Sequence, residues 1–457
     1  MRGPLHGHDF GVHADDEIGV AATMLLEQLG ARTAHGGDSS LGTVKVPEWR
    51  GNAEEWAASG AMTLTGHADG PPLAPDAPLG ARLRAAEAVL AFLSSCVGRR
   101  VDVDVLALLG ERAALAGLTR RGRTSVGGAA RLLEAHDGWV VVNLARDNDV
   151  ESIPAWLELD EVATNPWEAV ATAIARRDAA EVVDGAQLLG IAAAVVPEAG
   201  TTRDDPQLAP WVISGEGGQR PPTDPPLVVD LSPLWAGPLC AHLLGLAGAR
   251  VVKVESTGRP DAMRAGNPAL FDLLHSRHES VVLDLAASEG QGALHELIMQ
   301  ADVVIEESRP RALEQMGIVL DEVRRERPNL TWVSITGYGR SGPWSDRVAF
   351  GDDAAAAAGL VVSDDRGAPV FCADAIADPI TGVFAAIGAL ASLLGGGGHL
   401  VDVALRDAAG YACGDQAGPR GEAARIGVAE PRARPVHSPA RPFGADTARV
   451  LKEMGVA

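Results

Sequence analysis

The sequence is poor in lysine, in aromatic residues and in positive charge. Only three of its 457 residues are lysine (Lys45, Lys253 and Lys452), and aromatic residues make up 4%. The formal net charge is −22. A field of this sign repels nucleic acids and anionic membranes, which excludes a general nucleic-acid-binding protein. Any anionic ligand must be held by a local group of arginines, whose planar guanidinium keeps its charge and suits phosphate.

Cysteine is also scarce, and long apolar runs are missing. The four cysteines, Cys96, Cys240, Cys372 and Cys413, are far apart, so no pair has the spacing of a metal or redox motif. We therefore expect free, buried thiols in a reducing compartment. No early segment resembles a secretory signal, and no apolar run reaches the roughly 18–20 residues of a membrane span. These absences predict a cytoplasmic protein that does not enter a membrane.

From Pro226 onward, short apolar strands alternate with helical segments. The predicted strands are PLVVDLS, RVVKVE, SVVLDL, DVVIEES and LTWVSITGYG. Helices of about 10–15 residues between such strands indicate an α/β fold, with a parallel sheet covered by helices on both faces. Ligands of such sheets bind at the carboxyl ends of the strands. The loops WAGP, KVES, LDL, EESRP and GYGRSG are therefore the candidate binding segments.

The chain also contains a repeat. LAFLSSCVGRRVDVDV (90–105) matches LASLLGGGGHLVDVAL (390–405) at a constant offset, and MLLEQLGAR matches HLLGLAGAR. We interpret this as an internal duplication whose first copy is truncated. The predicted organisation is a truncated first copy (1–135), a small α+β domain (136–200), a Gly/Pro-rich linker (201–225), a fuller second copy (226–415), and a C-terminal loop and helix (416–457).

One aspartate in the stretch ADAIADPITG (373–382) has two possible roles. Asp378 is followed by Pro379, which is typical of a helix start, so Asp378 is either a helix cap or a reactive carboxylate. The two roles are compatible, since a helix N-terminus lowers the pKa of a carboxylate and keeps it ionised. The first copy has Pro78 at the matching position, and its helical pattern persists without an aspartate. Asp374 is the nearest rival and has no evident role.

Six motifs in order carry a resemblance to a known family. They are VVDLSPLWAGPLCAHLLGLAGARVVKVES, SVVLDL, ADVVIEESRPRALEQMG, NLTWVSITGYGRSGPW, ADAIADPITGVFAAIGALASL and GHLVDVALRDA. This run resembles the family III CoA-transferases, which include formyl-CoA and carnitine CoA-transferases and α-methylacyl-CoA racemases. The resemblance covers about 226–413 and extends more weakly over the first copy. It implies a Rossmann-like open sheet with a small domain, as a homodimer or a single-chain pseudo-dimer.

The resemblance implies an acyl-CoA:carboxylate CoA-transferase. In that family an aspartate attacks the thioester, a mixed anhydride forms, and CoA thiolate then gives an aspartyl-CoA thioester from which a carboxylic acid acceptor takes the CoA. The motif position places this aspartate on Asp378. Exchange of CoA between two acids needs a carboxylate that stores the acyl activation covalently. Coenzyme A and acyl-CoA are substrates, and no metal or permanently bound cofactor is expected.

The resemblance also implies a set of CoA contacts, mostly at strand ends. They are Trp235, Ala236, Ser256, Arg264, Arg277, His278, Leu283, Asp284, Glu307, Ser308, Arg309 and Gln315. The chain departs from the family here, because the usual Asn-Lys-Arg-Ser is Arg277-His278-Glu279-Ser280 and the usual Glu-Asn-Phe-Arg-Pro is Glu-Glu-Ser-Arg-Pro. Two cations are lost and carboxylates are gained near the expected phosphates.

Two other functions stay open. A racemase needs an acid/base pair to move the α-proton of an acyl thioester. Racemases of the family have a His-Asp pair where this chain has Gly351-Asp352-Asp353, and we expect these two aspartates to cap the next helix instead. The lost cations and the degenerate first copy leave room for a non-catalytic CoA-binding or scaffolding relative.

Overall fold

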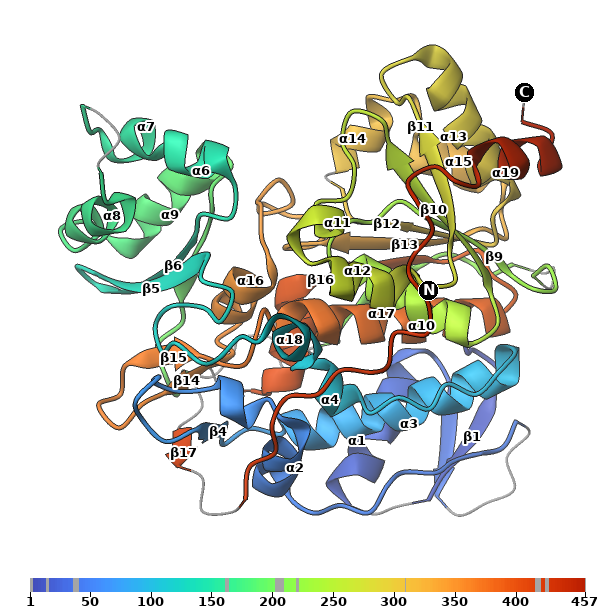
Figure 1. Cartoon of the computed structure of the whole chain (residues 1–457). Coiled ribbons are helices and arrows are strands. Elements are labelled where there is room, and N and C mark those ends of the chain that lie inside the picture. The colour runs from blue at the N-terminus through green and yellow to red at the C-terminus, as the bar shows by residue number, and fades with distance from the viewer. Residues whose placement is uncertain are drawn as a thin grey trace.

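The computed structural model describes residues 3–13, 16–35, 41–160, 164–201, 209–218, 222–308, 310–415, 421–423 and 427–456. A seven-stranded sheet forms one side of the molecule, and the first half of the chain packs below it (Figure 1). A smaller α+β unit stands to the left of both in Figure 1.

The large sheet confirms the predicted strands. From one edge to the other its strands are β11 (Glu279–Leu283), β10 (Arg250–Ser256), β9 (Leu227–Asp230), β12 (Val303–Glu306), β13 (Thr331–Thr336), β16 (Leu400–Ala404) and β8 (Val212–Ser214). All neighbours pair in parallel except β8, which is antiparallel to β16. The chain runs outward from β9 to β11 and then crosses to β12 on the other side of β9. This order is that of a Rossmann-like sheet, whose ligand crevice lies where the order reverses, between β9 and β12.

Helices cover both faces of this sheet, as the alternation of strands and helices predicts. One face packs against α13 (Ser288–Gln300), α14 (Pro310–Glu314), α15 (Leu320–Glu326) and α19 (Thr447–Glu453). The other face packs against α10 (Ala236–Leu246), α12 (Pro268–His275) and α17 (Ala377–Leu394). The connections contain α11 (Met263–Gly266), α16 (Gly351–Ala357), α18 (Leu405–Cys413) and the hairpin β14–β15 (Val361–Ser363, Pro369–Phe371). The strands point side chains to both faces, which explains their continuous apolar character.

The first half of the chain shares one hydrophobic core with the second. Its elements are β1 (Asp9–Val12), α1 (Glu17–Gln28), β2 (Arg32–His35), β3 (Thr43–Val44), α2 (Asn52–Ser59), η1 (Met62–Leu64), β4 (Leu73–Pro75), α3 (Leu79–Val97), α4 (Val105–Leu108) and α5 (Glu111–Ala116). The parallel sheet β2-β1-β3 repeats the β10-β9-β12 order on a small scale, and β4 pairs with β17 (Gly421–Ala423). Helix α3 packs on both α1 and α17. The duplication itself stays a prediction.

Two predicted domain boundaries do not coincide with the elements of the structure. The small unit is an antiparallel sheet of β5 (Ala130–Ala135), β6 (Gly138–Asn143) and β7 (Ala192–Val196), covered by α6 (Asp147–Glu151), α7 (Ile153–Leu157), α8 (Pro166–Ile174) and α9 (Ala179–Leu188). A boundary at 136 would divide the hairpin β5–β6. The predicted linker at 201–225 contains the strand β8. The prediction missed this short edge strand because the sequence around it is rich in glycine and proline. The other boundaries stay predictions.

Helix α17 corrects the expectation that no apolar run reaches the length of a membrane span. By length and composition alone it could cross a membrane. It is, however, largely buried inside the structure, packed against α3, α10, β13 and β16. A central core helix and a membrane span share the same composition, so this helix is weak evidence for a membrane. The four cysteines, all of them among the described residues, form no disulfide bond, as predicted, and Cys96 is the least buried of them.

Close packing of α17 on α10 predicts a strong effect at Gly382. A Cβ there would lie 2.6 Å from the carbonyl oxygen of Ala236 and 3.0 Å from Cβ of Leu239. We expect Gly382→Ala to lower the free energy of unfolding by about 1–3 kcal/mol. The matched control is Gly292→Ala in the middle of α13, where a Cβ would meet nothing within 4 Å and the higher helix propensity of alanine should add up to ~1 kcal/mol. Urea denaturation of both variants checks this, and equal stability would contradict it.

Candidate active site

Asp378 does not cap its helix. Helix α17 begins at Ala377 and its N-cap residue is Ile376, with no side-chain capping hydrogen bond. The backbone N–H of Asp378 donates to the carbonyl of Ala375 at 2.9 Å, so Asp378 already lies inside the first turn. The helix-cap interpretation is therefore wrong, and the carboxyl group of Asp378 is left for other contacts.

The loop before Asp378 has an unusual backbone. Ala373 and Ala375 adopt left-handed conformations, with φ of 56° and 42°, which cost alanine about 1–3 kcal/mol each. Two side chains hold them in place: the N–H of Ala373 donates to Oγ1 of Thr65 at 3.0 Å, and the N–H of Ala375 donates to Oδ1 of Asp352 at 2.9 Å. Strain that the surroundings enforce in this way is typical of functional sites.

An arginine from the first half of the chain reaches this loop. Arg112, on α5, donates through Nε to Oδ2 of Asp374 at 2.9 Å and through its second nitrogen to Oδ1. Asp374 is fully buried, and the guanidinium also lies over the ring of Trp235, 5.4 Å from its centroid. Asp374 is thus the anchor of a buried ion pair and not an incidental neighbour of Asp378. No sequence motif points to Arg112, since the pair joins positions 262 residues apart.

The pKa of Asp378 is raised to about 8, and burial is the main cause. The charge of Arg112 lowers this pKa, and the carboxylates of Asp352, Asp353 and Asp374 raise it. The expectation that the helix N-terminus keeps this carboxyl at a low pKa is therefore wrong, because the loss of water outweighs the helix dipole. The side chain still keeps part of its surface accessible. The carboxyl group of Asp378 is thus largely removed from water, while part of the residue stays exposed.

The surrounding carboxyl groups share this dry environment. Burial is the main cause that raises the pKa of Asp352 to about 6 and that of Asp353 to about 7. The pKa of Glu307 lies well above its ordinary value because its carboxyl group has lost most of its contact with water and because the charge of Asp378 is near. Glu307 accepts a hydrogen bond from the N–H of Gly237, at the start of α10, at 3.3 Å. The site is thus an acid cluster at the crevice between β9 and β12.

The start of α16 closes against Asp378. A Cβ at Gly351 would lie 2.6 Å from Oδ2 of Asp378, so only glycine leaves room for the carboxyl group. Asp353 accepts the backbone N–H of Phe350 at 3.1 Å, which confirms its predicted capping role, and also the side-chain amide of Asn143 at 3.0 Å. Asp352 bonds the loop before Asp378 instead, so its predicted capping role is wrong.

The predicted CoA contacts fall into three groups by exposure. The buried ones are Trp235, Ala236, His278 and Leu283. The partly exposed ones are Ser256, Arg264, Glu307 and Ser308, and the exposed ones are Arg277, Asp284 and Gln315. Arg309 lies outside the described residues. Several of these residues follow the carboxyl ends of β9 to β12, whereas Arg277 and His278 precede β11. The burial of the first group counts against direct side-chain contacts, and the CoA contacts stay a prediction.

Two of the predicted contacts already have partners. The guanidinium of Arg264 binds Glu255 at 2.6 Å and lies between the rings of Phe271 and Phe443, 4.3 and 5.4 Å from their centroids. His278 lies 3.1 Å from a second histidine, His275. Neither residue is a free cation at the crevice, so CoA binding by these side chains stays a prediction.

A separate cavity of about 300 Å³ lies near the amino end of β9, at the opposite end of the strand from the crevice. It is lined by residues that include Val97, Pro226, Leu244 and Leu390, where the carboxyl ends of α3, α10 and α17 meet. Since Pro226 precedes β9, this cavity is remote from the crevice at the carboxyl ends of the strands.

Comparison with known proteins identifies the second half. Residues 226–445 match the model for CoA-transferase family III, a range that contains the crevice and Asp378. This segment belongs to CoA-transferase family III. The match begins where β9 begins, so the half that supplies Arg112 lies outside it.

Characterised relatives of the family III segment act on different acids. It is 33% identical over 202 residues to the succinyl-CoA–D-citramalate CoA-transferase of Chloroflexus aurantiacus, covering 41% of this chain and 50% of that protein. It is 30% identical over 194 residues to a formyl-CoA:oxalate CoA-transferase of Escherichia coli, covering 40% and 47%. A solved CAIB/BAIF family protein from Brucella suis is 27% identical, with a TM-score of 0.39 over 44% of this chain and 60% of that one. The chain spans about half the length of the curated relatives it matches.

The raised pKa of Asp378 predicts a pH-dependent cost to folding. Its folded-state pKa of about 8 exceeds the ordinary 3.8, so between these pH values the folded state holds a proton that the unfolded state releases. Stability therefore falls as pH rises through this window. We expect Asp378→Asn to flatten this fall and to be more stable than the parent at pH 8 by about 1 kcal/mol or more.

Urea denaturation from pH 5 to pH 9 measures this effect. The matched control is Asp365→Asn, at an exposed position on the β14–β15 turn, which should keep the parent's slope. A slope for Asp378→Asn that equals the parent's would show that Asp378 titrates normally.

Proposed function

We propose that the chain is an acyl-CoA:carboxylate CoA-transferase that works through a covalent intermediate on Asp378. The observation that carries the proposal is the setting of Asp378: a largely buried carboxyl in the first turn of α17, directly after a strained loop, at the switch point of the sheet and within the electrostatic influence of Arg112. The family III match and the names of the relatives support the same reaction class.

The transfer needs four balanced steps. The Asp378 carboxylate attacks the thioester carbonyl, the C–S bond breaks, and CoA leaves as a thiolate from a mixed anhydride. The thiolate then attacks the aspartyl carbon, which releases the donor acid and leaves an aspartyl-CoA thioester. The acceptor carboxylate and CoA repeat the two steps in reverse order, which restores Asp378. No oxidation occurs, and no proton is gained or lost overall.

The charges around Asp378 fit this cycle. A carboxylate with a raised pKa is a stronger nucleophile once ionised, and the low-polarity surroundings that raise it also protect an anhydride from water. Arg112 is fixed by Asp374 and stacked on Trp235, so its charge is available near Asp378 without a rearrangement. Preorganised charge of this kind stabilises the negative oxygen that develops in each tetrahedral intermediate.

We infer that the first half acts as a built-in partner for the second. It contributes Thr65, Arg112 and Asn143 to the surroundings of Asp378, and each contacts the second half through a hydrogen bond. Its own counterpart of Asp378 is Pro78. A single-chain pseudo-dimer with one reactive aspartate accounts for both observations.

Trapping of the intermediate tests the proposal. After incubation with succinyl-CoA or formyl-CoA, hydroxylamine should convert Asp378 to a hydroxamate that peptide mass analysis detects. Asp378→Asn should abolish the adduct and lower CoA transfer by at least about 10³-fold, whereas Asp365→Asn should leave both unchanged. CoA binding with an unmodified Asp378 would favour the non-catalytic relative, and deuterium uptake at the α-carbon would favour a racemase.

The first step should depend on the ionisation of Asp378. We expect the rate of CoA release in a single turnover to rise about tenfold per pH unit below pH 7 and to level off above about pH 8, because only the ionised carboxyl attacks. Stopped-flow detection of free thiol at saturating acyl-CoA measures this rate. A rate that is constant from pH 5 to pH 8 would contradict the raised pKa.

A further inference from the structure

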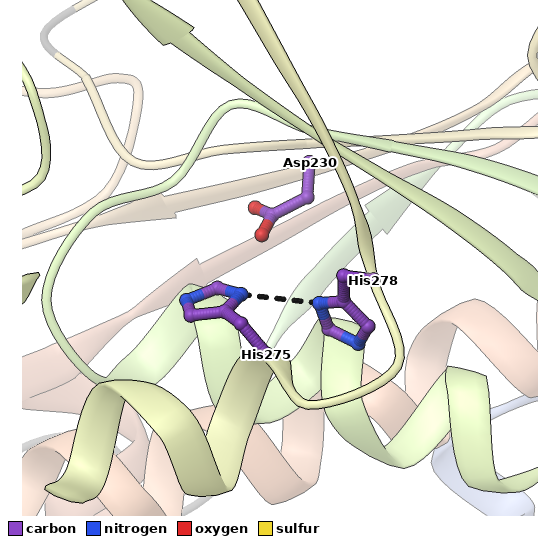
Figure 2. Close-up of side chains that lie close together, drawn as sticks. All are labelled: Asp230, His275 and His278. Atoms are coloured by element: carbon purple, nitrogen blue, oxygen red, sulfur yellow. Dashed lines mark hydrogen bonds between the residues drawn. The ribbon is translucent and has the colours of Figure 1, made fainter. Parts of the chain in front are cut away.

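A second group of polar side chains lies inside the molecule, apart from Asp378. Asp230 ends β9, His275 ends α12, and His278 stands in the turn before β11. Their exposed fractions are 0%, 2% and 4%, and one possible ligand atom from each lies within 4.8 Å of the others. Figure 2 shows the two imidazole rings side by side, joined by a hydrogen bond between their nitrogens, with the carboxylate of Asp230 above them.

The spacing of the two histidines is close to that of a chelating pair. Their Nδ1 atoms are 3.1 Å apart. Two imidazole nitrogens bound tetrahedrally to zinc, at about 2.0–2.1 Å each, lie roughly 3.3 Å apart. Small side-chain movements would therefore bring both nitrogens and a carboxylate oxygen onto one ion.

The charges around the group leave room for a cation. The ammonium of Lys253 lies 3.2 Å from Asp261 and 3.7 Å from Asp230, so one positive charge faces two carboxylates.

Two polar atoms of the group lack hydrogen-bond partners among the described residues. They are Nε2 of His275 and Oδ2 of Asp230, which lies 3.7 Å from the ammonium of Lys253. The other oxygen of Asp230 accepts from the backbone N–H and the hydroxyl of Ser232, which fixes the orientation of the carboxylate. A second shell of this kind is usual for a ligating carboxylate.

We propose that Asp230, His275 and His278 bind one divalent transition-metal ion, with zinc as the first candidate. Two imidazoles and a carboxylate suit zinc and its neighbours in the first transition row better than magnesium or calcium. Lys253 keeps Asp261 and the carbonyl of Ser232 as partners when Asp230 turns to the metal. The ion ties the end of β9 to the α12–β11 turn, and its presence is independent of the transferase reaction.

Metal analysis of the full-length protein tests the site. After treatment with a chelator and equilibration with zinc, the protein should hold one tightly bound ion per chain, and cobalt in its place should give the visible absorption of a low-symmetry, four-coordinate site. His278→Gln should lose the bound ion and the visible absorption. The matched control is His242→Gln, since the ring of His242 lies 6.3 Å from that of His278 but outside the group.

A metal-free explanation makes the opposite prediction. Without a metal, the Nδ1–H of one histidine donates a hydrogen bond to Nδ1 of the other, and the carboxyl group of Asp230 is protonated. In that case the parent protein holds no stoichiometric zinc and gives no such cobalt absorption, which overturns the proposal even if His278→Gln fails to fold. Retention of the ion by a folded His278→Gln variant would place the metal elsewhere, for example on exposed histidines.

Discussion

The ion pair between Arg112 and Asp374 is the contact on which the arrangement around Asp378 depends. It joins an arginine of the first half to an aspartate of the second, and it lies in the interior. Removing one partner of such a buried pair costs about 3–5 kcal/mol, because the other charge is left without compensation. The pair fixes the strained loop 373–375 and supplies the positive charge that opposes the carboxylates of the site. The same ion pair therefore joins the two halves and sets the charge around Asp378.

The acid cluster explains why this pairing is needed. Asp352, Asp353, Glu307 and Asp378 all have raised pKa values because they are buried near one another. Bringing such groups together destabilises the fold at neutral pH, and the packing of α17 against α3 and α10 offsets that cost. A site of this kind lowers the stability of the fold but holds a carboxyl group that is reactive and protected from water. The proposed pseudo-dimer provides this without a second chain.

The sequence predicted the large sheet well because its strands are short, apolar and regularly separated by helices. The hydrophobic pattern and the alternation of strands and helices are enough to predict the strands β9 to β13 and the crevice at their carboxyl ends. The sequence could not reveal Arg112, whose partner is remote along the chain, or the left-handed conformations of Ala373 and Ala375, which alanine rarely adopts. It also misjudged the pKa of Asp378, because a helix start is visible in a sequence whereas burial is a property of the fold. The edge strand β8 was hidden for the same reason, since its pairing with β16 is tertiary.

We infer that an arginine from the first half controls the charge on Asp378. Titration of the Asp378 carboxyl tests this inference most directly, followed by NMR of ¹³C-labelled aspartate in the parent protein and in a folded Arg112→Gln variant. We expect a midpoint near 8 in the parent and a higher midpoint in the variant, because Arg112 lowers the pKa and Asp374 would lose its partner. An unchanged midpoint in the folded variant would contradict the inference.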